Sequence, residues 1–478
     1  MGVAPPVTRH EFDLAVIGAG SAGLSVTAVA ARLGLRVALI ERGRMGGDCL
    51  NAGCVPSKAL LAAAHAAQAA RRAHRLGVSL AKPVVDWAAV RAHVHGVVAA
   101  IAPNDSEERF RDLGATVLRG EARFAAADSL EVDGARLSAR RIVIAAGSRP
   151  AIPPVNGLER LAPLTNETLF EMAERPEHLL ILGGGPIGLE MADAHAGLGC
   201  RVTVVEADRI AGHDDPELAA GLREALTRKG VVILEGVAVA EAAPGPALVL
   251  RDGRRLSGSH LLVAAGRRPN LEALALDAGG VGATSSGIAT DAGLRSLTNR
   301  RVFAAGDIAD PRGIGPRAFT HVGTYHAGVV IRRALFRLPA RLDYRALPRV
   351  TYTDPELAQV GPTEDEARAA GRRVSVLRWE MAENDRAQAE RDTAGMVKLV
   401  VERGRVIGAG ILAPHAGEMI GQWTLAIERA LPVRASAELI APYPTRAEAG
   451  KRAAGAYYGA RLFAPRTRRL VRALAWLR

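Results

Sequence analysis

Two of the three cysteines in this 478-residue chain stand close together in the segment GGDCLNAGCVPSK, residues 46 to 58. Four residues separate Cys49 from Cys54, and Lys58 follows one helical turn later. At the start of a helix this spacing brings two sulfurs within bridging reach, and the helix N-terminus favours the reactive thiolate. A zinc site needs four ligands, and the chain has no second cysteine pair to complete one. The segment therefore favours thiol redox chemistry, and we predict no metal site.

Two Gly-rich segments resemble each other in sequence, and we expect them to position the groups that react with these thiols. Residues 12–42 and 178–208 each predict an apolar strand, a G-x-G-x-x-G turn, an Ala-rich helix and a second strand that ends in Glu. Such a turn lets a pyrophosphate approach the backbone at a helix N-terminus, and the Glu accepts hydrogen bonds from a ribose. Two dinucleotide sites are therefore predicted. Their residues are Gly18, Gly20, Ser21, Ala22, Gly23, Glu41 and Arg42 in the first, and Gly183, Gly185, Pro186, Ile187, Gly188 and Glu206 in the second.

Three further strand ends return the chain past these sites. RRIVIAAGSRP (140–150) and HLLVAAGRRPN (260–270) match each other, and RVFAAGDIAD (301–310) ends in Gly-Asp. The carboxylate of Asp307 suits a polyol such as the ribityl chain of FAD, and its alternative use is a helix N-cap. The other predicted cofactor contacts at these strand ends are Ala146, Gly147, Gly266, Arg267 and Gly306.

Composition limits the class of protein. The net charge of +12 favours anionic partners such as nucleotides or anionic lipid, and we see no nucleic-acid recognition motif. Three cysteines are too few for a disulfide scaffold, no secretory signal is visible, and no apolar run has the length of a membrane helix. We therefore expect a cytoplasmic protein, with peripheral membrane contact left open by its C-terminus.

The redox segment, the two nucleotide units and a β-rich C-terminal part make the chain similar to the class I pyridine nucleotide–disulfide oxidoreductases. That family includes dihydrolipoyl dehydrogenase, glutathione reductase and mercuric reductase, and the resemblance covers about residues 11–455. It implies an α/β fold with two Rossmann-like three-layer domains and a C-terminal α+β dimerisation domain. The expected ranges are 1–150 with 273–340 for FAD, 151–272 for NAD(P), 341–455 for dimerisation, and 456–478 for a basic amphipathic tail.

The resemblance also implies an enzyme and assigns roles. NAD(P)H would reduce FAD, and FAD would reduce a Cys49–Cys54 disulfide, with Cys54 nearer the flavin and Cys49 attacking the substrate. Lys58 would pair with Glu190 and face the flavin, and Gly47 and Asp48 of the same segment would be further cofactor contacts. Glu206 favours NADH over NADPH, and the nearby Arg209 blurs this preference. Cys200 is expected to be a small buried residue.

One departure from the family pattern bears on the electron acceptor. The disulfide reductases use a His from the partner subunit, before Pro-Thr-x-x-Glu, as the proton donor to the leaving thiolate. Here Tyr443 replaces that His, whereas Pro444, Thr445 and Glu448 match. A Tyr is a poor base near neutral pH, so dihydrolipoyl dehydrogenase activity is expected to be weak. We also expect a cis Tyr443–Pro444 bond.

A Tyr at this position is similar to mercuric reductase, in which it helps to hold the metal ion beside the cysteine pair. We therefore expect a homodimer in which Tyr443 and Glu448 reach the partner's cysteine pair. The expected acceptor is a soft metal ion such as mercuric ion, or an oxidised sulfur species. The tail lacks the paired cysteines of mercuric reductases. A quinone reduced directly by flavin, and a non-enzymatic redox sensor or membrane-tethered module, remain alternatives.

The tail GARLFAPRTRRLVRALAWLR is basic with interleaved apolar residues. From Arg466 onward it predicts a helix with Leu470, Val471, Leu474 and Leu477 on one side. Packing on its own dimer, or docking on an anionic membrane, would each use that side.

Overall fold

The structure is a computed structural model that describes residues 10–476. Its first sheet has the order β3-β2-β1-β6-β5-β4, with β18 pairing to β6. The central strands are parallel and buried on both faces, as in a sheet covered by helices on each side. Its strands are β1 (Phe12–Ile17), β2 (Val37–Glu41), β3 (Ala115–Arg119), β4 (Ala122–Ala126), β5 (Ser129–Val132), β6 (Ala135–Ile144) and β18 (Val302–Ala304).

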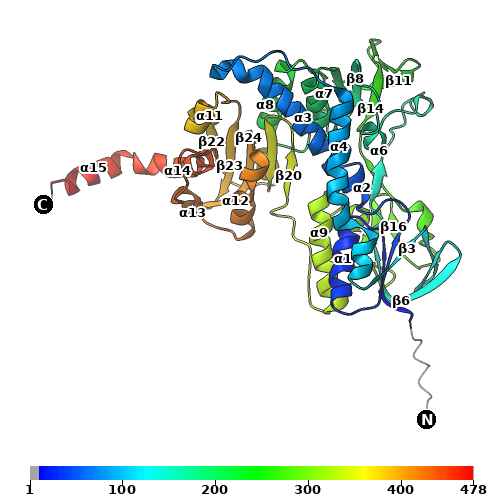
Figure 1. The fold of residues 1–478 in the computed structure, drawn as a ribbon. Helices are drawn as coiled ribbons and strands as arrows, with labels where there is room; N and C mark the ends of the chain where they lie inside the picture. The colour runs from blue at the N-terminus through cyan, green and yellow to red at the C-terminus, as the bar shows by residue number, and fades with distance from the viewer. Residues whose placement is uncertain (1–9, 477–478) are drawn as a thin grey trace.

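Helices cover this sheet, and two of them, α3 and α4, extend from it toward the second region of the chain (Figure 1). α1 packs against α9, and α3 packs against both α4 and α7 of the second region. These helices are α1 (Ser21–Arg32), α2 (Gly47–Asn51), α3 (Cys54–Arg72), α4 (Trp87–Ile101), α5 (Glu107–Asp112) and α9 (Thr320–Val330). A small sheet of β16 (Ala283–Thr284), β17 (Gly287–Thr290) and β19 (Ala309–Pro311) completes the region.

The second region repeats the parallel arrangement with the strand order β10-β9-β8-β14. Its strands are β8 (His178–Leu182), β9 (Arg201–Val205), β10 (Val232–Leu234) and β14 (His260–Val263), with α7 (Pro186–Gly197) and α8 (Pro216–Arg228) as its helices. A three-stranded sheet of β11 (Val239–Ala243), β12 (Ala247–Leu250) and β13 (Arg255–Ser257) adds to it, and α6 (Asn166–Leu169) precedes it. The matched return loops pair with each other, because β7 (Ser148–Pro150) and β15 (Arg267–Pro269) form an antiparallel ribbon between the two regions.

The third region is a five-stranded antiparallel sheet with the order β20-β21-β24-β23-β22. Its strands are β20 (Pro348–Thr351), β21 (Glu356–Val360), β22 (Ser375–Glu380), β23 (Met396–Glu402) and β24 (Arg405–Ala413). Its helices are α10 (Glu364–Ala369), α11 (Asp385–Ala389), α12 (Ala416–Glu428), α13 (Val433–Ala437) and α14 (Glu448–Leu462). The predicted fold class is confirmed; the predicted domain boundaries stay predictions.

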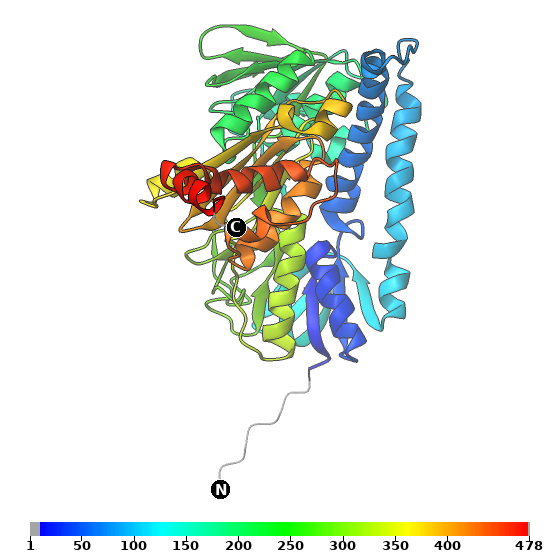
Figure 2. The ribbon, with the colours of Figure 1, turned by 90° about the vertical axis from the view of Figure 1, so that its left-hand side faces the viewer.

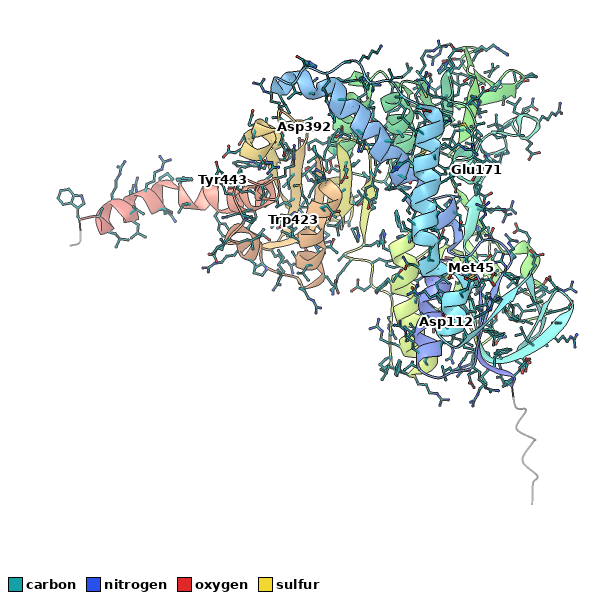
Figure 3. All side chains as sticks on the ribbon, in the orientation of Figure 1. Met45, Asp112, Glu171, Asp392, Trp423 and Tyr443 are labelled. Carbon is teal, nitrogen blue, oxygen red and sulfur yellow. The ribbon has the colours of Figure 1, made fainter. Side chains whose placement is uncertain are left out.

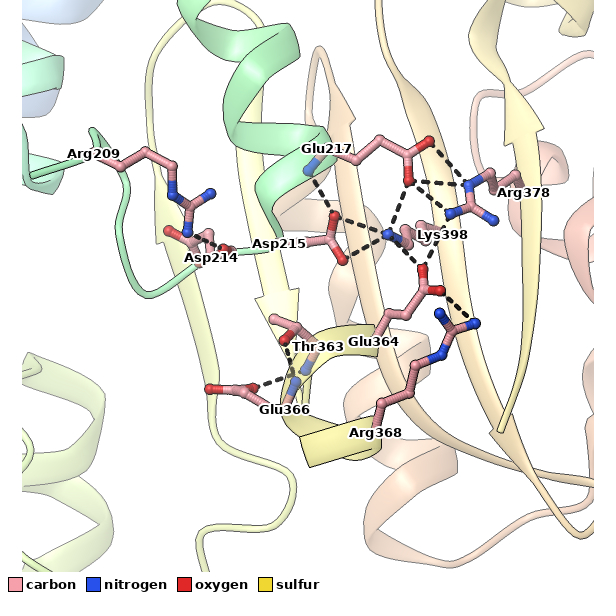
Figure 4. Close-up of polar contacts among 10 residues, drawn as sticks. All are labelled: Arg209, Asp214, Asp215, Glu217, Thr363, Glu364, Glu366, Arg368, Arg378 and Lys398. Atoms are coloured by element: carbon pink, nitrogen blue, oxygen red, sulfur yellow. Dashed lines mark hydrogen bonds and ion pairs between the residues drawn. The ribbon is translucent and has the colours of Figure 1, made fainter. Parts of the chain in front are cut away.

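A buried lysine joins the second and third regions (Figure 4). Lys398 on β23 is 4% exposed, and its ammonium lies 2.9 Å from Asp215, 2.8 Å from Glu217 and 3.0 Å from Glu364. Arg378 supplies a second cation to Glu217 and Glu364, so the charges are largely balanced. A buried charge is tolerated only with such partners, so this cluster fixes α8 against the third sheet.

The tail forms α15 (Pro465–Leu474), which extends away from the body of the third region (Figures 1 and 2). Leu470, Val471 and Leu474 are more than half exposed, and no residue of this helix is buried. Leu477, the fourth predicted member of the apolar side, lies outside the described residues. Within residues 10–476, no helix combines the length and the apolar character that crossing a membrane requires.

Candidate active site

The first and third glycines of each G-x-G-x-x-G turn meet a close approach of the backbone. Gly18 and Gly183 have φ of +101° and +117°, and a Cβ on either would lie 2.4 Å from a carbonyl oxygen of the neighbouring strand end. A Cβ on Gly23 would come within 1.9 Å of the Gly18 carbonyl, and one on Gly188 within 2.0 Å of the Gly183 carbonyl. These positions therefore require glycine for packing.

The second glycines face open space instead. A Cβ on Gly185 would meet no atom within 4 Å, and one on Gly20 would meet only the Gly47 Cα, at 3.9 Å. Both α1 and α7 start without a side-chain cap and without an acidic residue in the first turn. Their first amide groups thus remain for an anionic ligand, and both turns fit the pyrophosphates of FAD and NAD(P).

Glu41 and Glu206 close the two turns in the same way. Glu41 Oε2 accepts a hydrogen bond of 2.7 Å from the Ala19 amide, and Glu206 Oε2 accepts one of 2.7 Å from the Gly184 amide. Each carboxylate also accepts from the backbone two residues on, at Gly43 and Asp208. These contacts hold both carboxylates at the rim where a ribose would lie.

One large cleft of about 2710 Å³ connects the two turns with the cysteines. It is lined by Cys49, Cys54, Lys58, Glu190 and every predicted cofactor residue except the packing glycines Gly23 and Gly188. Within residues 10–476, no cluster of three or more His, Cys, Asp or Glu side chains could hold a metal ion.

Both cysteines of the pair are free thiols at the junction of α2 and α3. Cys54 is the first residue of α3, its Sγ lies 3.4 Å from Thr320 Oγ1, and it shares a hydrogen bond with Cys49. The hydrogen bond from Cys49, with help from Thr320 and Lys58, lowers the pKa of Cys54 to about 6. The same hydrogen bond, together with burial, raises the pKa of Cys49. Above about pH 6 and below the raised pKa of Cys49, the pair therefore holds one proton, with the thiolate on Cys54.

The expected contact between Lys58 and Glu190 is present. Lys58 Nζ lies 2.7 Å from Glu190 Oε2, which joins α3 to α7. Glu190 is 5% exposed, and its other oxygen accepts a hydrogen bond of 3.1 Å from the Tyr352 amide. The Tyr352 ring lies 4.3 Å from the Lys58 ammonium. The pair thus lines the same cleft as the cysteines and both predicted nucleotide sites.

Asp307 belongs to a polar network that lines the cleft. Its Oδ2 accepts a hydrogen bond of 2.6 Å from Ser148, and Arg267 lies 3.7 Å away. Arg267 also contacts Asp48 at 3.1 Å, while burial raises the pKa of Asp307. The helical turn at Gly306–Ile308 has Ala305 as its N-cap, so Asp307 does not serve as that cap.

Tyr443 and Glu448 do not line the cleft of their own chain, and Figure 3 shows Tyr443 on the third region. Tyr443 is 69% exposed on the third region, and its hydroxyl donates a hydrogen bond of 2.9 Å to Asp385. This hydrogen bond raises the pKa of Tyr443. Glu448 begins α14 and accepts from Arg452 at 2.9 Å. The Tyr443–Pro444 bond is cis, as expected.

The sequence reasoning assigned no role to several residues of the cleft. Thr320 contacts the Cys54 sulfur, Ser148 contacts Asp307, Tyr352 covers Lys58, and Asn166 donates to Asp48 at 2.9 Å. Of these residues, Ser148 lies in a segment already singled out, RRIVIAAGSRP (140–150). Cys200 is buried, as expected, and burial raises its pKa to about 11.

Comparisons with known proteins agree with this geometry. Residues 12–329 match the family described as pyridine nucleotide-disulphide oxidoreductase, and residues 347–454 match its dimerisation domain. The chain is 37% identical over 463 residues to a mercuric reductase of Streptomyces lividans, covering 93% of this chain and 95% of that protein. It is 34% identical to a dihydrolipoyl dehydrogenase of Geobacillus stearothermophilus, covering 93% and 96%.

Solved structures give the same result. The chain is similar to the Cu(II) complex of the HOCl-induced flavoprotein disulfide reductase RclA from Escherichia coli, with a TM-score of 0.82, 27% identity, and 92% and 98% of the two chains covered. It is also similar to LpdA from Mycobacterium tuberculosis, with a TM-score of 0.83, 26% identity, and 94% and 100% covered.

The chain belongs to the pyridine nucleotide–disulphide oxidoreductase family. It is an NAD(P)H-dependent flavoprotein disulfide reductase that carries the dimerisation domain of this family.

Proposed function

We propose that this enzyme passes electrons from NAD(P)H to the Cys49–Cys54 pair and on to a soft metal ion such as mercuric ion. The observation that carries the proposal is the pair itself: two free thiols in hydrogen-bond contact, with the pKa of Cys54 lowered to about 6. Soft thiolates select soft metal ions over hard ones. Overall, NAD(P)H and Hg(II) would give NAD(P)⁺, elemental mercury and one proton.

FAD, when bound, would supply the relay of electrons between NAD(P)H and the thiols. The residues of the chain would bind the metal ion and stabilise the thiolate. Cys49 and Cys54 bind the metal ion, and the hydrogen bond from Thr320 keeps the Cys54 sulfur in place. Lys58, held by Glu190 at 2.7 Å, keeps a positive charge beside the thiolate and the predicted flavin position.

Tyr443 of the partner subunit is proposed as the third group at the metal. In its own chain it lies outside the cleft and is 69% exposed, so its ring remains for a neighbouring subunit. Its pKa is raised by Asp385, so the phenol stays protonated near neutral pH and is a poor base for disulfide chemistry. This favours a metal ion over an oxidised sulfur species as the acceptor.

The proposed nicotinamide is NADH. Glu206 stands at the predicted ribose position, where a carboxylate repels a 2′-phosphate. Arg209, the one nearby cation weighed against it, instead donates to the carbonyls of Gly212 and Asp214 at 3.0 and 3.1 Å. Its guanidinium is thereby directed to the backbone of its own loop.

An acceptor panel with the purified FAD-loaded enzyme tests the proposal. Mercuric ion, cupric ion, lipoamide, glutathione disulfide and a soluble quinone would each be offered with NADH, for the wild type and Cys49→Ser. We expect metal-dependent NADH oxidation that Cys49→Ser abolishes. Turnover confined to the quinone and unchanged in Cys49→Ser would overturn the proposal in favour of direct flavin chemistry. Negligible turnover with every acceptor would instead support a redox-sensing role.

For α15 we propose contact with an anionic membrane surface. The helix presents Leu470, Val471 and Leu474 beside exposed Trp476 and carries four arginines with no acidic residue. This combination of an apolar side with cationic flanks is typical of interfacial helices. Its charge complements anionic lipid, whereas a second copy of this chain is itself strongly basic.

Flotation with phosphatidylcholine vesicles, with and without phosphatidylserine, tests this contact. We expect the full chain to float only with the anionic vesicles and less at high salt, and a chain ending at residue 463 to stay in solution. Failure to float, or dissociation of the truncated protein into monomers, would show that the helix packs on the dimer instead. Binding to a DNA duplex with equal strength would also overturn the proposal.

A further inference from the structure

Two carboxylates on α7 hold the backbone segment that follows β20. Glu190 and Asp193 lie almost one turn apart and are 5% and 0% exposed. Glu190 Oε1 accepts a hydrogen bond of 3.1 Å from the Tyr352 amide, and Asp193 Oδ2 accepts one of 2.8 Å from the Asp354 amide. Charge-assisted hydrogen bonds of this kind are stronger than neutral ones. The segment 352–354 is therefore fixed to α7.

The remaining oxygens of these carboxylates bind cations. Glu190 Oε2 pairs with Lys58 at 2.7 Å, and Asp193 Oδ1 pairs with Lys229 at 2.7 Å. Asp354 in turn pairs with Arg72 at 2.7 Å, near the end of α3. The segment 352–354 is thus tied to both ends of the helix that begins at Cys54.

This anchoring places an aromatic ring on the lysine of the redox centre. The Tyr352 ring centroid lies 4.3 Å from Lys58 Nζ, within the range of a cation–π contact. Both side chains line the cleft that contains Cys54. Burial, with the charges of Glu356, Glu190 and Cys54, raises the pKa of Tyr352, so the ring stays a neutral phenol. The ammonium is thus bracketed by a carboxylate and an aromatic face.

We propose that Tyr352 is a positioning residue: its ring keeps the Lys58 ammonium beside the Cys54 sulfur, and Glu190 and Asp193 keep the ring in place. The Lys58 side chain is flexible and 36% exposed. Without the Tyr352 ring, its ammonium would therefore exchange between contact with Glu190 and a solvated position. The role concerns the thiolate itself, so it does not depend on which acceptor the enzyme uses.

The charged and titratable groups near the Cys54 sulfur come from four elements. They are Cys49 on α2, Lys58 on α3, Glu190 on α7 and Tyr352 after β20, with the Thr320 hydroxyl on α9 as a further hydrogen-bond partner. Lys58 is the cation among them, so a change in its position alters the thiolate directly.

The test compares Tyr352→Leu with Tyr352→Phe in the full-length FAD-loaded enzyme after reduction. The readouts are the alkylation rate of Cys54 by iodoacetamide against pH, measured on the Cys54 peptide, and the pH midpoint of the thiolate-to-flavin absorbance. We expect Tyr352→Leu to move both midpoints upward and to slow alkylation at pH 6.5 on the order of three- to tenfold. Tyr352→Phe keeps the ring and is expected to keep the wild-type profile.

Two results would overturn the proposal. One is a wild-type pH profile in Tyr352→Leu; the other is an equal shift in the Leu and Phe variants, which would assign the effect to the hydroxyl. The backbone hydrogen bond to Glu190 survives in both variants, and Tyr352 is 38% exposed, so both should fold. If the Leu variant nevertheless unfolds, Tyr352→Met offers the same loss of the ring, and the same two outcomes apply.

Discussion

Glu41 and Glu206 hold the same place in two copies of one structural unit: each accepts a hydrogen bond of 2.7 Å from the amide that follows the first glycine of its turn. The equivalence makes each a control for the other. Glu206→Gln removes the charge that disfavours a 2′-phosphate, so the preference for NADH over NADPH should fall on the order of tenfold. Steady-state kinetics with both nicotinamides measures this. Glu41→Gln should leave the ratio unchanged, and an equal effect of both variants would refute the assignment.

Substitutions at Gly185 and Gly188 should have different effects, one on NADH binding and the other on the stability of the fold. Gly188→Ala places a Cβ 2.0 Å from the Gly183 carbonyl oxygen, and the strain should cost about 1–3 kcal/mol in the free energy of unfolding. Gly185→Ala meets no atom of the chain, so its stability should match the wild type while KM for NADH rises. Urea unfolding measures the stability of both variants, and initial rates measure their KM for NADH. Unchanged KM in Gly185→Ala would contradict pyrophosphate binding at this turn.

Cys49→Ala should reduce the nucleophilicity of Cys54 at neutral pH. The hydrogen bond from Cys49 is the main cause of the Cys54 pKa of about 6, and its loss should move that pKa upward, toward that of an ordinary thiol, about 8.5. The thiolate exists above the pKa, so the variant should react slowly at pH 7 and recover at pH 9. Alkylation rates of Cys54 from pH 5 to 10 measure the midpoint. A midpoint that stays near 6 would mean that Lys58 and the helix N-terminus suffice.

Lys398→Met should unfold the enzyme more readily. It leaves the buried Asp215 without the cation that it contacts, whereas Arg378 still pairs with Glu217 and Glu364. Removing one partner of a buried ion pair typically costs about 3–5 kcal/mol. Lys82→Met, at an exposed position, is the matched control and should have little effect. Denaturant unfolding at pH 7.5 compares them, and equal stability of the two variants would show that the cluster contributes nothing.

Acid should weaken the same cluster in the wild type. Hydrogen bonds from Arg378 and Lys398 lower the pKa of Glu217 to about 2. A carboxyl whose pKa is lowered on folding contributes stability above its unfolded pKa of about 4.3, and this is lost as pH falls toward 2. Unfolding measured between pH 6 and 3 should therefore show a loss of stability that is smaller in Lys398→Met, in which Arg378 alone still lowers the pKa of Glu217. Parallel pH curves for the two proteins would contradict this.

Tyr443→His should restore a proton donor suited to disulfides. An imidazole titrates near neutral pH, and Asp385 already stands at hydrogen-bond distance from the group it would replace. We expect lipoamide or glutathione reductase activity to rise roughly a hundredfold, whereas Tyr443→Phe should bring no gain. No increase in Tyr443→His would mean that the shape of the pocket, rather than the missing acid, excludes such substrates.

The sequence predicted best those features that depend on local conformation. Gly18 and Gly183 are recognisable because a left-handed φ and a close carbonyl admit glycine alone, and Cys54 because its helix start follows from its neighbours. The role of Tyr352 could not be predicted, since its contact with Lys58 depends on how the third region packs against α7. The burial of Lys398 could not be predicted either. It depends on three carboxylates from two other elements, which contact its ammonium only in the folded chain.

The placement of Tyr443 has a genetic consequence. This ring lies outside the cleft of its own chain. If it completes the site of the partner subunit, as we propose, each site draws its thiols and its phenol from different polypeptides. Subunits inactivated at Cys54 and subunits inactivated at Tyr443 would then form mixed dimers with one intact site. Two defective alleles in the same cell should therefore complement each other, although neither supports activity alone.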